Sequence, residues 1–480
     1  MREVQPVLDR HCASCHDGSQ PDLPYLKGDL KLTDWATHMP GQWRNGGRFT
    51  KSYADLQRFV RRPGIEGDRR MFTPMDYHFS TTALGKLLRK GHHGVQLDPE
   101  GWERLTTWAD LNAQFVGTWS EVLEKDISQV SNRALELRKR YVPMGPFPDY
   151  EAIPQATAYD PTPVAPKEEK NEPQPTPDVK GWPFDAATAT SLQKKEKGGK
   201  NPLTLDLGSG VRMEMLRIPG GTFAMGSPDG HPDEQPVCEA TVGPLWMGKT
   251  EVTNKQFRQF DPNHESRTED RHGYQFGITG YEQDQPDQPA VRVSWQEAMA
   301  FCKWLSEKTG KKVTLPTEAE WEWACRAGTS TPFWYGGIDS DFSKSANLGD
   351  AMLAQFVGNP YEQDRVKAAV KNPGPYDNWI PQDARFNDGG FVTEPVGKYE
   401  PNPWGLLDMH GNAAEWTRSA YLPYPYKNDD GRNQPEATGD KVVRGGSWYD
   451  RPKCATASYR VPFAPFQRVY NVGFRVVIED

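Results

Sequence analysis

The stretch Leu315-Pro-Thr-Glu-Ala-Glu-Trp-Glu-Trp323 shows most directly how the C-terminal part of this chain folds. Thr317 and Glu320 have the spacing of a capping box, in which each side chain bonds the backbone N–H of the other residue. The stretch therefore predicts a helix that opens here and continues to Cys325.

Two further helices are predicted around this stretch. Ser294 and Glu297 repeat the capping-box spacing, and the apolar residues that follow recur at helical intervals until Gly310 ends the pattern. Thr253-Asn-Lys-Gln256 is predicted to open a third helix. Short strand-like runs and long loops fill the rest of the region, so two or three helices within irregular β structure predict an α+β domain.

Composition divides the 480 residues into three segments. Residues 1–142 have mostly helical patterns, residues 143–179 are rich in proline and charge, and residues 180–480 form the α+β region. The middle segment cannot bury enough apolar surface to fold and is predicted to be a semi-rigid linker. The net charge of −8 gives no reason to expect nucleic acid or an anionic membrane surface as a partner. There is also no apolar run long enough for a spanning helix.

Within residues 1–142 five helices are predicted. One runs from Arg2 into Cys12, one from Tyr53 to Arg62, one from a Ser80 cap to Gly91, one from Asp98-Pro99 through Trp108, and one from Glu121 to Tyr141. This segment is therefore predicted to be all-α.

The residues Cys12-Ala-Ser-Cys15-His16 match the CxxCH signature of haem c attachment. Two thiols at this spacing reach the two vinyl groups of haem, and the adjacent histidine becomes the proximal iron ligand. A thioredoxin-like CxxC would follow a strand, and a zinc site would need a second cysteine pair. The motif therefore predicts covalent haem c bound through Cys12, Cys15 and His16.

The sixth iron ligand has four candidates in the sequence: Met75, His78, His92 and His93. Met75 lies in a Thr-Pro-Met-Asp run, and His92 follows the Gly91 helix stop. We favour His92, with Met75 as the second choice. Two imidazoles would close the iron to substrate and make the domain an electron carrier.

This region resembles the haem domain of planctomycete-type multidomain proteins, including the hydrazine synthase alpha subunit. The resemblance covers about residues 3–120 and rests on the CxxCH, Arg62-Pro63, Pro74-Met75-Asp-Tyr-His78, Leu87-Leu-Arg-Lys-Gly-His92 and Leu105-Thr-Thr-Trp108-Ala-Asp110-Leu-Asn112. It implies bis-histidine ligation, which favours His92.

Haem attachment implies export, so a periplasmic or extracellular location and a redox partner protein are predicted. Residues 1–6 have no basic or apolar leader region, and we therefore interpret Met1 as a fragment boundary.

From residue 205 the chain resembles the sulfatase-modifying-factor family, whose founding member is the formylglycine-generating enzyme. The motifs are Arg217-Ile-Pro-Gly-Gly-Thr-Phe-Ala-Met-Gly226, Lys249-Thr-Glu-Val-Thr-Asn254, Val293-Ser-Trp295, Leu315 to Trp323, Asn402-Pro-Trp-Gly-Leu-Leu-Asp408, Gly411-Asn-Ala-Ala-Glu-Trp416, Arg444-Gly-Gly-Ser-Trp448 and Asn471-Val-Gly-Phe-Arg475. The resemblance implies that family's irregular α+β fold, related to C-type lectins. A multidomain protein is thus predicted, with an all-α cytochrome c-like haem domain before the α+β domain.

Formylglycine-generating enzymes bind copper(I) and the substrate thiol through two cysteines after the Gly-Gly-Ser. Here Asp450 replaces the first, and Cys454 lies only near the second. Because copper(I) prefers soft thiolates, formylglycine generation is not expected. Cys302 and Cys325 match one half of each of two family disulfides, but valines stand at the partner positions. We expect Cys302 and Cys325, together with Cys238 and Cys454, to be small buried residues.

The resemblance also implies calcium, held by side-chain and backbone oxygens as a hard cation requires. One ligand set would be Asp408, Gly411, Ala413 and Glu415, and the second Asn347, Leu348, Asp388 and Phe391. The alternative is that these carboxylates only tie loops together by hydrogen bonds.

Three functions remain open. The first is a haem c electron carrier fused to a domain that binds or scaffolds. The second is a redox enzyme in which the haem serves oxidative chemistry in the C-terminal domain, although His231, His264, His272 and His410 are scattered. The third is a lectin-like module with a protein or glycan ligand and a redox-sensing haem.

Overall fold

The computed structural model describes residues 1–31, 49–61, 74–115, 157–167, 175–196, 201–269, 280–353 and 381–479, with scattered residues between 133 and 141. The chain forms two compact units. The first contains the described residues up to 61 and those from 93 to 167, and the second contains residues 74–92 and those from 175 onward. Residues 74–92 therefore pack with the C-terminal unit. The predicted boundaries at residues 142 and 179 stay predictions.

The N-terminal unit is mostly helical, as its patterns predict. Its elements are α1 (Gln5–His11), α2 (Lys51–Leu56), the 3-10 helix η1 (Gln57–Phe59), η4 (His92–Gly94) and α4 (Pro99–Asp110). Val7 and Leu8 of α1 and Leu105 and Trp108 of α4 are buried, and these two helices pack against each other. Most of the predicted helix from Glu121 to Tyr141 lies outside the described residues.

Polar contacts connect residues 157–167 to helices α1 and α4. Asp98 caps α4 by accepting from the Gly101 N–H at 2.7 Å, and its other oxygen accepts from the Tyr159 hydroxyl at 2.7 Å. Tyr159 also lies 2.9 Å from Nε2 of the buried His11. Residues 157–167, inside the predicted linker, thus bond both helices.

Helix α3 (Ala83–Arg89) is capped by Thr82, whose hydroxyl accepts from the Gly85 N–H at 3.0 Å. The prediction of Ser80 as the cap is wrong. Ser80 lies within a preceding 3-10 turn, η3 (Phe79–Thr81), and its own N–H donates to His78 Nδ1 at 3.1 Å. The cap falls two residues later because this extra turn separates Ser80 from the helix.

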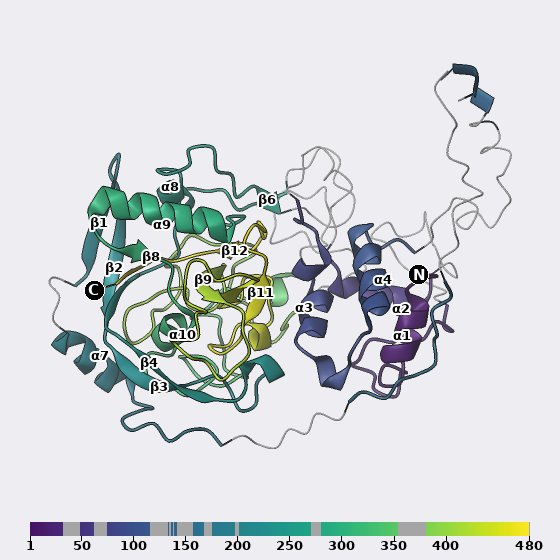
Figure 1. Cartoon of the computed structure of the whole chain (residues 1–480), viewed down its shortest axis with the longest axis horizontal. Coiled ribbons are helices and arrows are strands. Elements are labelled where there is room, and N and C mark those ends of the chain that lie inside the picture. The colour runs from purple at the N-terminus through teal and green to yellow at the C-terminus, as the bar shows by residue number, and fades with distance from the viewer. Residues whose placement is uncertain are drawn as a thin grey trace. The chain divides into compact units, whose positions relative to one another are not determined.

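The C-terminal unit is built on two main sheets (Figure 1). The five-stranded sheet has the order β1 (Leu203–Gly208), β2 (Val211–Ile218), β5 (Leu245–Gly248), β13 (Val477–Glu479) and β8 (Val313–Thr314). The four-stranded sheet has the order β11 (Val461–Phe463), β10 (Lys441–Arg444), β9 (Ala414–Ala420) and β12 (Val472–Gly473). Two ribbons add β3 (Gly221–Met225) with β4 (Cys238–Val242), and β6 (Thr268–Glu269) with β7 (Tyr281–Glu282). All pairings are antiparallel except that of β12 with β9.

Besides α3, the described part of this unit contains the helices α7 (Ala186–Lys195), α8 (Asn254–Phe257), α9 (Trp295–Thr309) and α10 (Glu318–Arg326). The two predicted capping boxes, which begin at Ser294 and Thr317, are both formed. The predicted helix at Thr253 also forms, and it too opens with a capping box. Gly310 ends α9 in the left-handed conformation (φ 66°), where a glycine has no steric cost. The predicted α+β fold of this region is confirmed.

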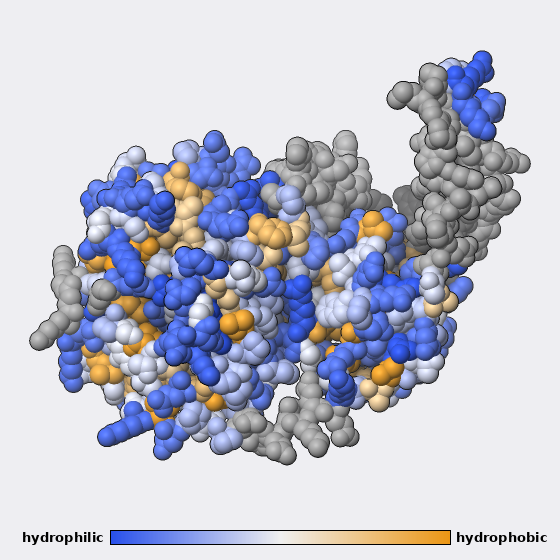
Figure 2. All heavy atoms as spheres, in the orientation of Figure 1, coloured by the Kyte–Doolittle hydropathy of each residue, from blue (hydrophilic) through white to orange (hydrophobic). Residues whose placement is uncertain are grey.

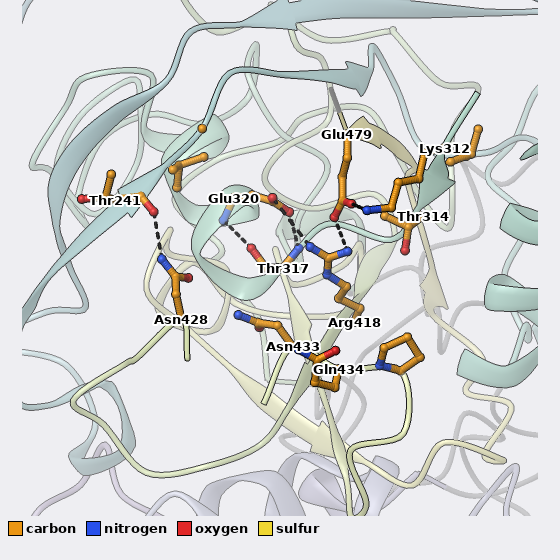
Figure 3. Close-up of a pocket in the computed structure, with 14 residues that line it drawn as sticks. Thr241, Lys312, Thr314, Thr317, Glu320, Arg418, Asn428, Asn433, Gln434 and Glu479 are labelled. Carbon is orange, nitrogen blue, oxygen red and sulfur yellow. Dashed lines mark hydrogen bonds and ion pairs between the residues drawn. The ribbon is translucent and has the colours of Figure 1, made fainter. Parts of the chain in front are cut away.

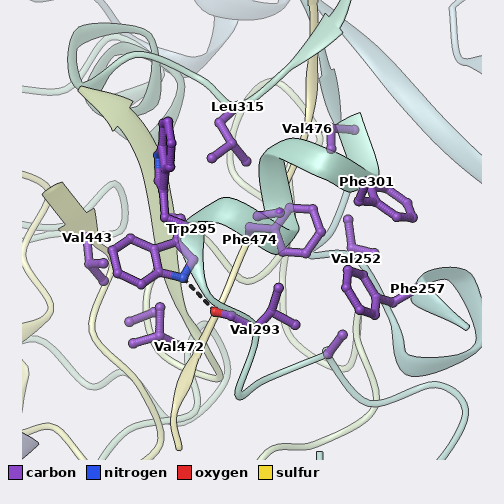
Figure 4. Close-up of a cluster of buried hydrophobic side chains, with 14 of the residues drawn as sticks. Val252, Phe257, Val293, Trp295, Phe301, Leu315, Val443, Val472, Phe474 and Val476 are labelled. Atoms are coloured by element: carbon purple, nitrogen blue, oxygen red, sulfur yellow. Dashed lines mark hydrogen bonds between the residues drawn. The ribbon is translucent and has the colours of Figure 1, made fainter. Parts of the chain in front are cut away.

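The largest apolar core lies between α9 and the two sheets (Figure 4). Phe301 and Leu305 on the inner face of α9 are fully buried, with Phe474 packed at 5.5 Å between ring centroids from Phe301. Trp416 from β9 donates its indole N–H to the carbonyl of Val293 at 2.8 Å. Burial of these large side chains supplies the main stabilising free energy of the unit.

A network of buried charges lies beside this core. Glu318 and Glu322 on one face of α10 are fully buried and pair with Arg444 at 2.7 and 3.1 Å. Arg460 adds a contact to Glu318 at 2.6 Å, and Arg326 adds one to Glu322 at 2.8 Å. Buried charges are tolerated only when they are paired, so this network fixes α10 against β10 and the following loop.

Figure 2 shows a mostly hydrophilic surface, with apolar residues in small separate groups on the face displayed. In the part of the chain that the structure describes, no helix is long and apolar enough to cross a membrane.

Candidate functional site

The haem-attachment motif forms a compact turn at the end of α1. Cys12 is the C-cap of the helix, and the N–H groups of Cys15 and His16 both donate to its carbonyl, at 3.2 and 3.0 Å. Cys15 is exposed, whereas burial raises the pKa of the Cys12 thiol to about 12, with a smaller contribution from Cys15. The turn therefore places two thiols and an imidazole within five residues.

The imidazole of His16 is oriented by the backbone. Its Nδ1 lies 3.1 Å from the carbonyl oxygen of Pro24 and donates a hydrogen bond to it. This bond fixes the tautomer in which the lone pair is on Nε2, the arrangement that metal-ligating histidines use. Burial lowers the pKa of His16, which favours the neutral form that a metal requires. The residues present therefore fit a haem proximal ligand.

Of the four candidate sixth ligands, His93 has the clearest relation to His16. Both belong to the N-terminal unit, and the charge of His93 contributes to the lowered pKa of His16. His93 has a left-handed backbone (φ 47°) within η4. Met75, His78 and His92 are grouped with the C-terminal unit. The sequence preference for His92 stays a prediction.

The two carboxylates of the first predicted calcium set, Asp408 and Glu415, have different partners in the structure. Glu415 pairs with Arg475 at 2.6 Å and also accepts from the Trp321 indole N–H at 2.8 Å. Its carboxylate is therefore already neutralised. Asp408 instead lies beside Glu251, a residue that the sequence did not single out, and both are buried.

This carboxylate pair has unused oxygens. Asp408 Oδ2 accepts from the Gly397 N–H at 2.6 Å, and Glu251 Oε1 accepts from Asn412 Nδ2 at 3.1 Å. Asp408 Oδ1 and Glu251 Oε2 have no hydrogen-bond donor. Burial raises the pKa of Asp408 to about 6 and that of Glu251 well above its usual range, and the neighbouring carboxylates add to the effect at Glu251. Such a pair needs either a cation or a proton. Gly411 and Ala413 follow Asp408 on the same loop and could add only backbone carbonyls.

The second predicted calcium set brings two oxygens together. A Cβ at Gly390 would lie 2.6 Å from Asn347 Oδ1 and 2.9 Å from Asp388 Oδ1, so any side chain at this position would collide with both oxygens. Asp388 Oδ2 accepts from the Leu348 N–H at 2.8 Å. Burial, followed by the charge of Asp350, raises the pKa of Asp388 to about 7. Phe391 is buried, and its ring packs against Tyr281 at 4.3 Å between centroids.

The position of the family cysteine pair holds an ion pair. Asp450 Oδ2 accepts from the Ser447 hydroxyl at 2.6 Å, and its Oδ1 accepts from Lys86 Nζ at 3.1 Å. Cys454 ends the 3-10 helix η8 (Pro452–Cys454), and burial raises the pKa of its thiol, with Asp450 adding to the rise. One thiol and one salt-bridged carboxylate do not suit copper(I).

The remaining cysteines and histidines form no shared ligand set within the described ranges, where no group of three or more His, Cys, Asp or Glu side chains could hold a metal ion. Cys302 and Cys325 are buried as predicted, whereas Cys238 and Cys454 are half-buried. His410 lies 3.4 Å from the Cys325 thiol. His272 lies outside the described residues.

A polar pocket of about 600 Å³ opens between the end of β4, β8 and the start of α10 (Figure 3). Arg418 projects into it beside Glu479, with which it is ion-paired, and lies 3.9 Å from Glu320. Asn428 donates to the Thr241 carbonyl at 3.0 Å, and Gln434 lies at the lower rim. The walls thus offer amides, hydroxyls and balanced charges to a small polar ligand.

Comparisons with known proteins concern the C-terminal unit. The family model of the sulfatase-modifying factor enzyme 1-like domain matches residues 209–480. The inactive C-alpha-formylglycine-generating enzyme 2 of Bos taurus is 29% identical over 316 residues, which is 56% of this chain and 90% of that protein. The formylglycine-generating enzyme of Bos taurus is 27% identical over 310 residues, 55% of this chain and 74% of that protein.

Among solved structures, PvdO from Pseudomonas aeruginosa is similar at 27% sequence identity. The match covers 59% of this chain and 100% of that one, with a TM-score of 0.42. The family model begins at residue 209 and so does not describe the N-terminal unit. Since it matches more than half of the 480 residues, the chain belongs to the sulfatase-modifying factor family through its C-terminal domain.

Proposed function

We propose that this chain is a haem c electron-transfer protein whose C-terminal domain binds or scaffolds and does not generate formylglycine. The observation that carries the proposal is the turn from Cys12 to His16, with the His16 Nδ1 proton donated to Pro24 O at 3.1 Å. A CxxC pair followed at once by an imidazole, with the ligating nitrogen set by a backbone hydrogen bond, is the arrangement that covalent haem attachment uses.

We propose His93 as the second axial ligand, in preference to His92. His93 belongs to the same compact unit as His16, whereas His92 is grouped with the other unit, and the effect of the His93 charge on the pKa of His16 agrees with this choice. The haem would supply one-electron transfer, and the residues of this chain would hold it, set its axial ligation and exclude water. Two imidazole ligands leave no open position for substrate, which favours electron transfer over catalysis.

The C-terminal domain lacks what the family reaction needs. Asp450 stands at the first cysteine position and is neutralised by Lys86 at 3.1 Å. The similarity to the inactive enzyme of Bos taurus supports a binding role. Because haem attachment requires export, we propose a periplasmic or extracellular location and a redox protein as the electron partner.

The axial assignment is tested with the full chain, made with a haem-maturation system and with free calcium held constant. We expect His93→Ala to convert a six-coordinate low-spin spectrum to a high-spin one, whereas the matched control His92→Ala keeps the low-spin spectrum. Absorption and near-infrared spectra measure both. The reverse pattern would restore His92 as the ligand, and two unchanged spectra would exclude both histidines.

We also propose that the Asp408–Glu251 pair and the Asn347–Asp388 pair hold calcium. The unused oxygens of the first pair and the close approach of Asn347 Oδ1 and Asp388 Oδ1 to Gly390 support this, since Ca²⁺ takes carboxylate, amide and carbonyl oxygens. Calorimetric titration of the chelator-treated protein tests it. We expect Glu251→Gln to remove one binding event and Gly390→Ala to remove the other.

A second candidate function is capture of a small polyhydroxylated ligand, as in the lectin-like alternative. The pocket of about 600 Å³ with its amide and charged walls favours it. A glycan array tests this directly. Binding that is lost in Gln434→Ala and is equal for oxidised and reduced protein would support the candidate, and an array without signal would remove glycans as ligands.

A further inference from the structure

Helix α3 and the turn before it form a docking segment, residues 74–90, that packs on the rest of the C-terminal unit. Two lysines on this segment point into that unit. The Lys86 side chain is only 10% exposed, and its Nζ lies 3.1 Å from Asp450 Oδ1. Burying an ammonium is costly unless it is paired, so this contact is specific.

The second lysine is more deeply enclosed. Lys90 is 3% exposed, and its Nζ lies 2.9 Å from Asp233 Oδ2 and 3.6 Å from Glu234 Oε1. The same ammonium lies 4.1 Å from the centre of the Tyr459 ring, within the range of a cation–π interaction. Lys90 therefore occupies an acidic, aromatic-walled site built by residues far away in the sequence.

Polar contacts hold the start of the docking segment as well. Gln467, which is buried, donates to the Ser80 hydroxyl at 3.1 Å and to the Met75 carbonyl at 3.4 Å. Arg292 lies 3.6 Å from the Asp76 carboxylate, and both side chains are less than 5% exposed. Residues from separate parts of the C-terminal unit, around positions 233, 292, 450 and 467, therefore contact this segment.

The docking segment covers the position of the family cysteine pair. Asp450, Cys454 and Lys86 line a residual cavity of about 10 Å³. A cavity needs at least about 10–15 Å³ to hold one water molecule, so no substrate can enter while Lys86 is in place.

We propose that residues 74–90 are the resident ligand of the C-terminal domain, which uses the face of the family reaction to bind a dilysine helix of its own chain. This inference rests on the proposed binding role and names the partner. Negative Asp233, Glu234 and Asp450 match positive Lys86 and Lys90. The sequence places His93 three residues after Lys90, so the docked helix also anchors the chain that leads to the proposed haem ligand.

Hydrogen exchange of the full chain tests the docking. We expect Lys86→Met/Lys90→Met to raise amide exchange in residues 83–90 by about tenfold or more, because loss of both ion pairs favours local opening. Arg89→Gln is the matched control on the same helix. Its guanidinium is 40% exposed and lies 3.9 Å from Asp440, so its removal leaves exchange unchanged.

Alkylation of Cys454 provides an independent readout. We expect a maleimide to label Cys454 faster in the double lysine variant, as judged by peptide mapping, and at the wild-type rate in Arg89→Gln. Asp450→Asn keeps the side-chain size and serves if the double variant does not fold, with amide exchange in residues 83–90 as its readout because Asp450 also raises the pKa of the Cys454 thiol. Unchanged exchange and labelling in a folded variant would overturn the proposal.

Failure of the electron-transfer proposal can be distinguished from failure of the docking proposal. If wild-type protein carries no haem but α3 is protected and the lysine variants open it, docking stands and the electron-transfer proposal fails. If haem is bound and α3 exchanges freely in the wild type, the docking proposal fails alone.

Discussion

The two units differ in how far apart in the sequence the residues of their key contacts lie. In the N-terminal unit the decisive contacts of the motif are local: Cys15 and His16 bond the carbonyl of Cys12, and His16 bonds Pro24, eight residues away. In the C-terminal unit they are distant: Arg444 reaches Glu318 across 126 positions. Local chemistry can be interpreted from a short motif, whereas long-range pairing depends on the completed fold.

The largest difference in stability between the two units is expected when the buried charge network of the C-terminal unit is broken. Glu318→Gln removes the charge that Arg444 and Arg460 share, at 2.7 and 2.6 Å. Because breaking a buried ion pair leaves an uncompensated charge, we expect the C-terminal unit to lose about 3–5 kcal/mol. Urea unfolding followed by tryptophan fluorescence measures this. The haem spectrum of the N-terminal unit is expected to stay unchanged, and a matching loss of both signals would show that the units unfold together.

The next effect concerns pH. Asp408 has a folded pKa of about 6 against an ordinary value of 3.8, and Glu251 shifts in the same direction. Below pH 4 both states are protonated, and between about pH 4 and 6 only the unfolded state ionises freely. The contribution of Asp408 to stability in the absence of calcium therefore falls by about 3 kcal/mol as pH rises through this window and levels off above about pH 6. The contribution of Glu251, whose pKa is raised further, continues to fall above that pH.

The dependence of the unfolding free energy on pH is measured by chemical unfolding at a series of pH values with a chelator present. We expect Glu251→Gln to remove only the share of the pH dependence that Glu251 contributes and Asp408→Asn to remove the share of Asp408. Saturating calcium is expected to abolish both, because the cation keeps both carboxylates ionised in the folded state. A stability that rises over this window in chelator would contradict the buried pair.

Smaller effects are expected from the helix caps, which are local in both units. Thr50 accepts from the Tyr53 N–H at 3.3 Å in the N-terminal unit, and Thr317 accepts from the Glu320 N–H at 3.1 Å in the C-terminal unit. We expect Thr50→Ala and Thr317→Ala each to cost about 1 kcal/mol, since one helix N–H is left without its side-chain partner. Thermal unfolding checks both, with Thr→Ser variants as controls. A loss above 3 kcal/mol at either position would mean that the cap has a long-range role.

The same division explains what could be predicted from sequence. The capping boxes at Ser294 and Thr317 and the Gly310 stop depend on residues three to sixteen apart, and all formed as predicted. The Ser80 cap failed because an intervening 3-10 turn has no strong sequence signal.

The long-range partners could not be predicted. Nothing in the sequence links Glu251 to Asp408, and the motif Lys249-Thr-Glu-Val-Thr-Asn254 shows only that Glu251 belongs to a family signature. The family resemblance assigned Glu415 to a calcium set, but its ion pair with Arg475, 60 positions away, has no signal in the sequence. Lys86 and Asp450, 364 positions apart, illustrate the same point for the docking segment.

The central claim is that haem is bonded to Cys12 and Cys15, with His16 as its iron ligand. Acid–acetone extraction of export-matured protein, followed by a pyridine haemochrome assay of the precipitate, tests it most directly. We predict one haem per chain retained in the precipitate for the wild type and for the Cys238→Ser control, and none for Cys12→Ser/Cys15→Ser. Pigment that extracts into the acetone, or wild-type protein without a Soret band, would contradict the account.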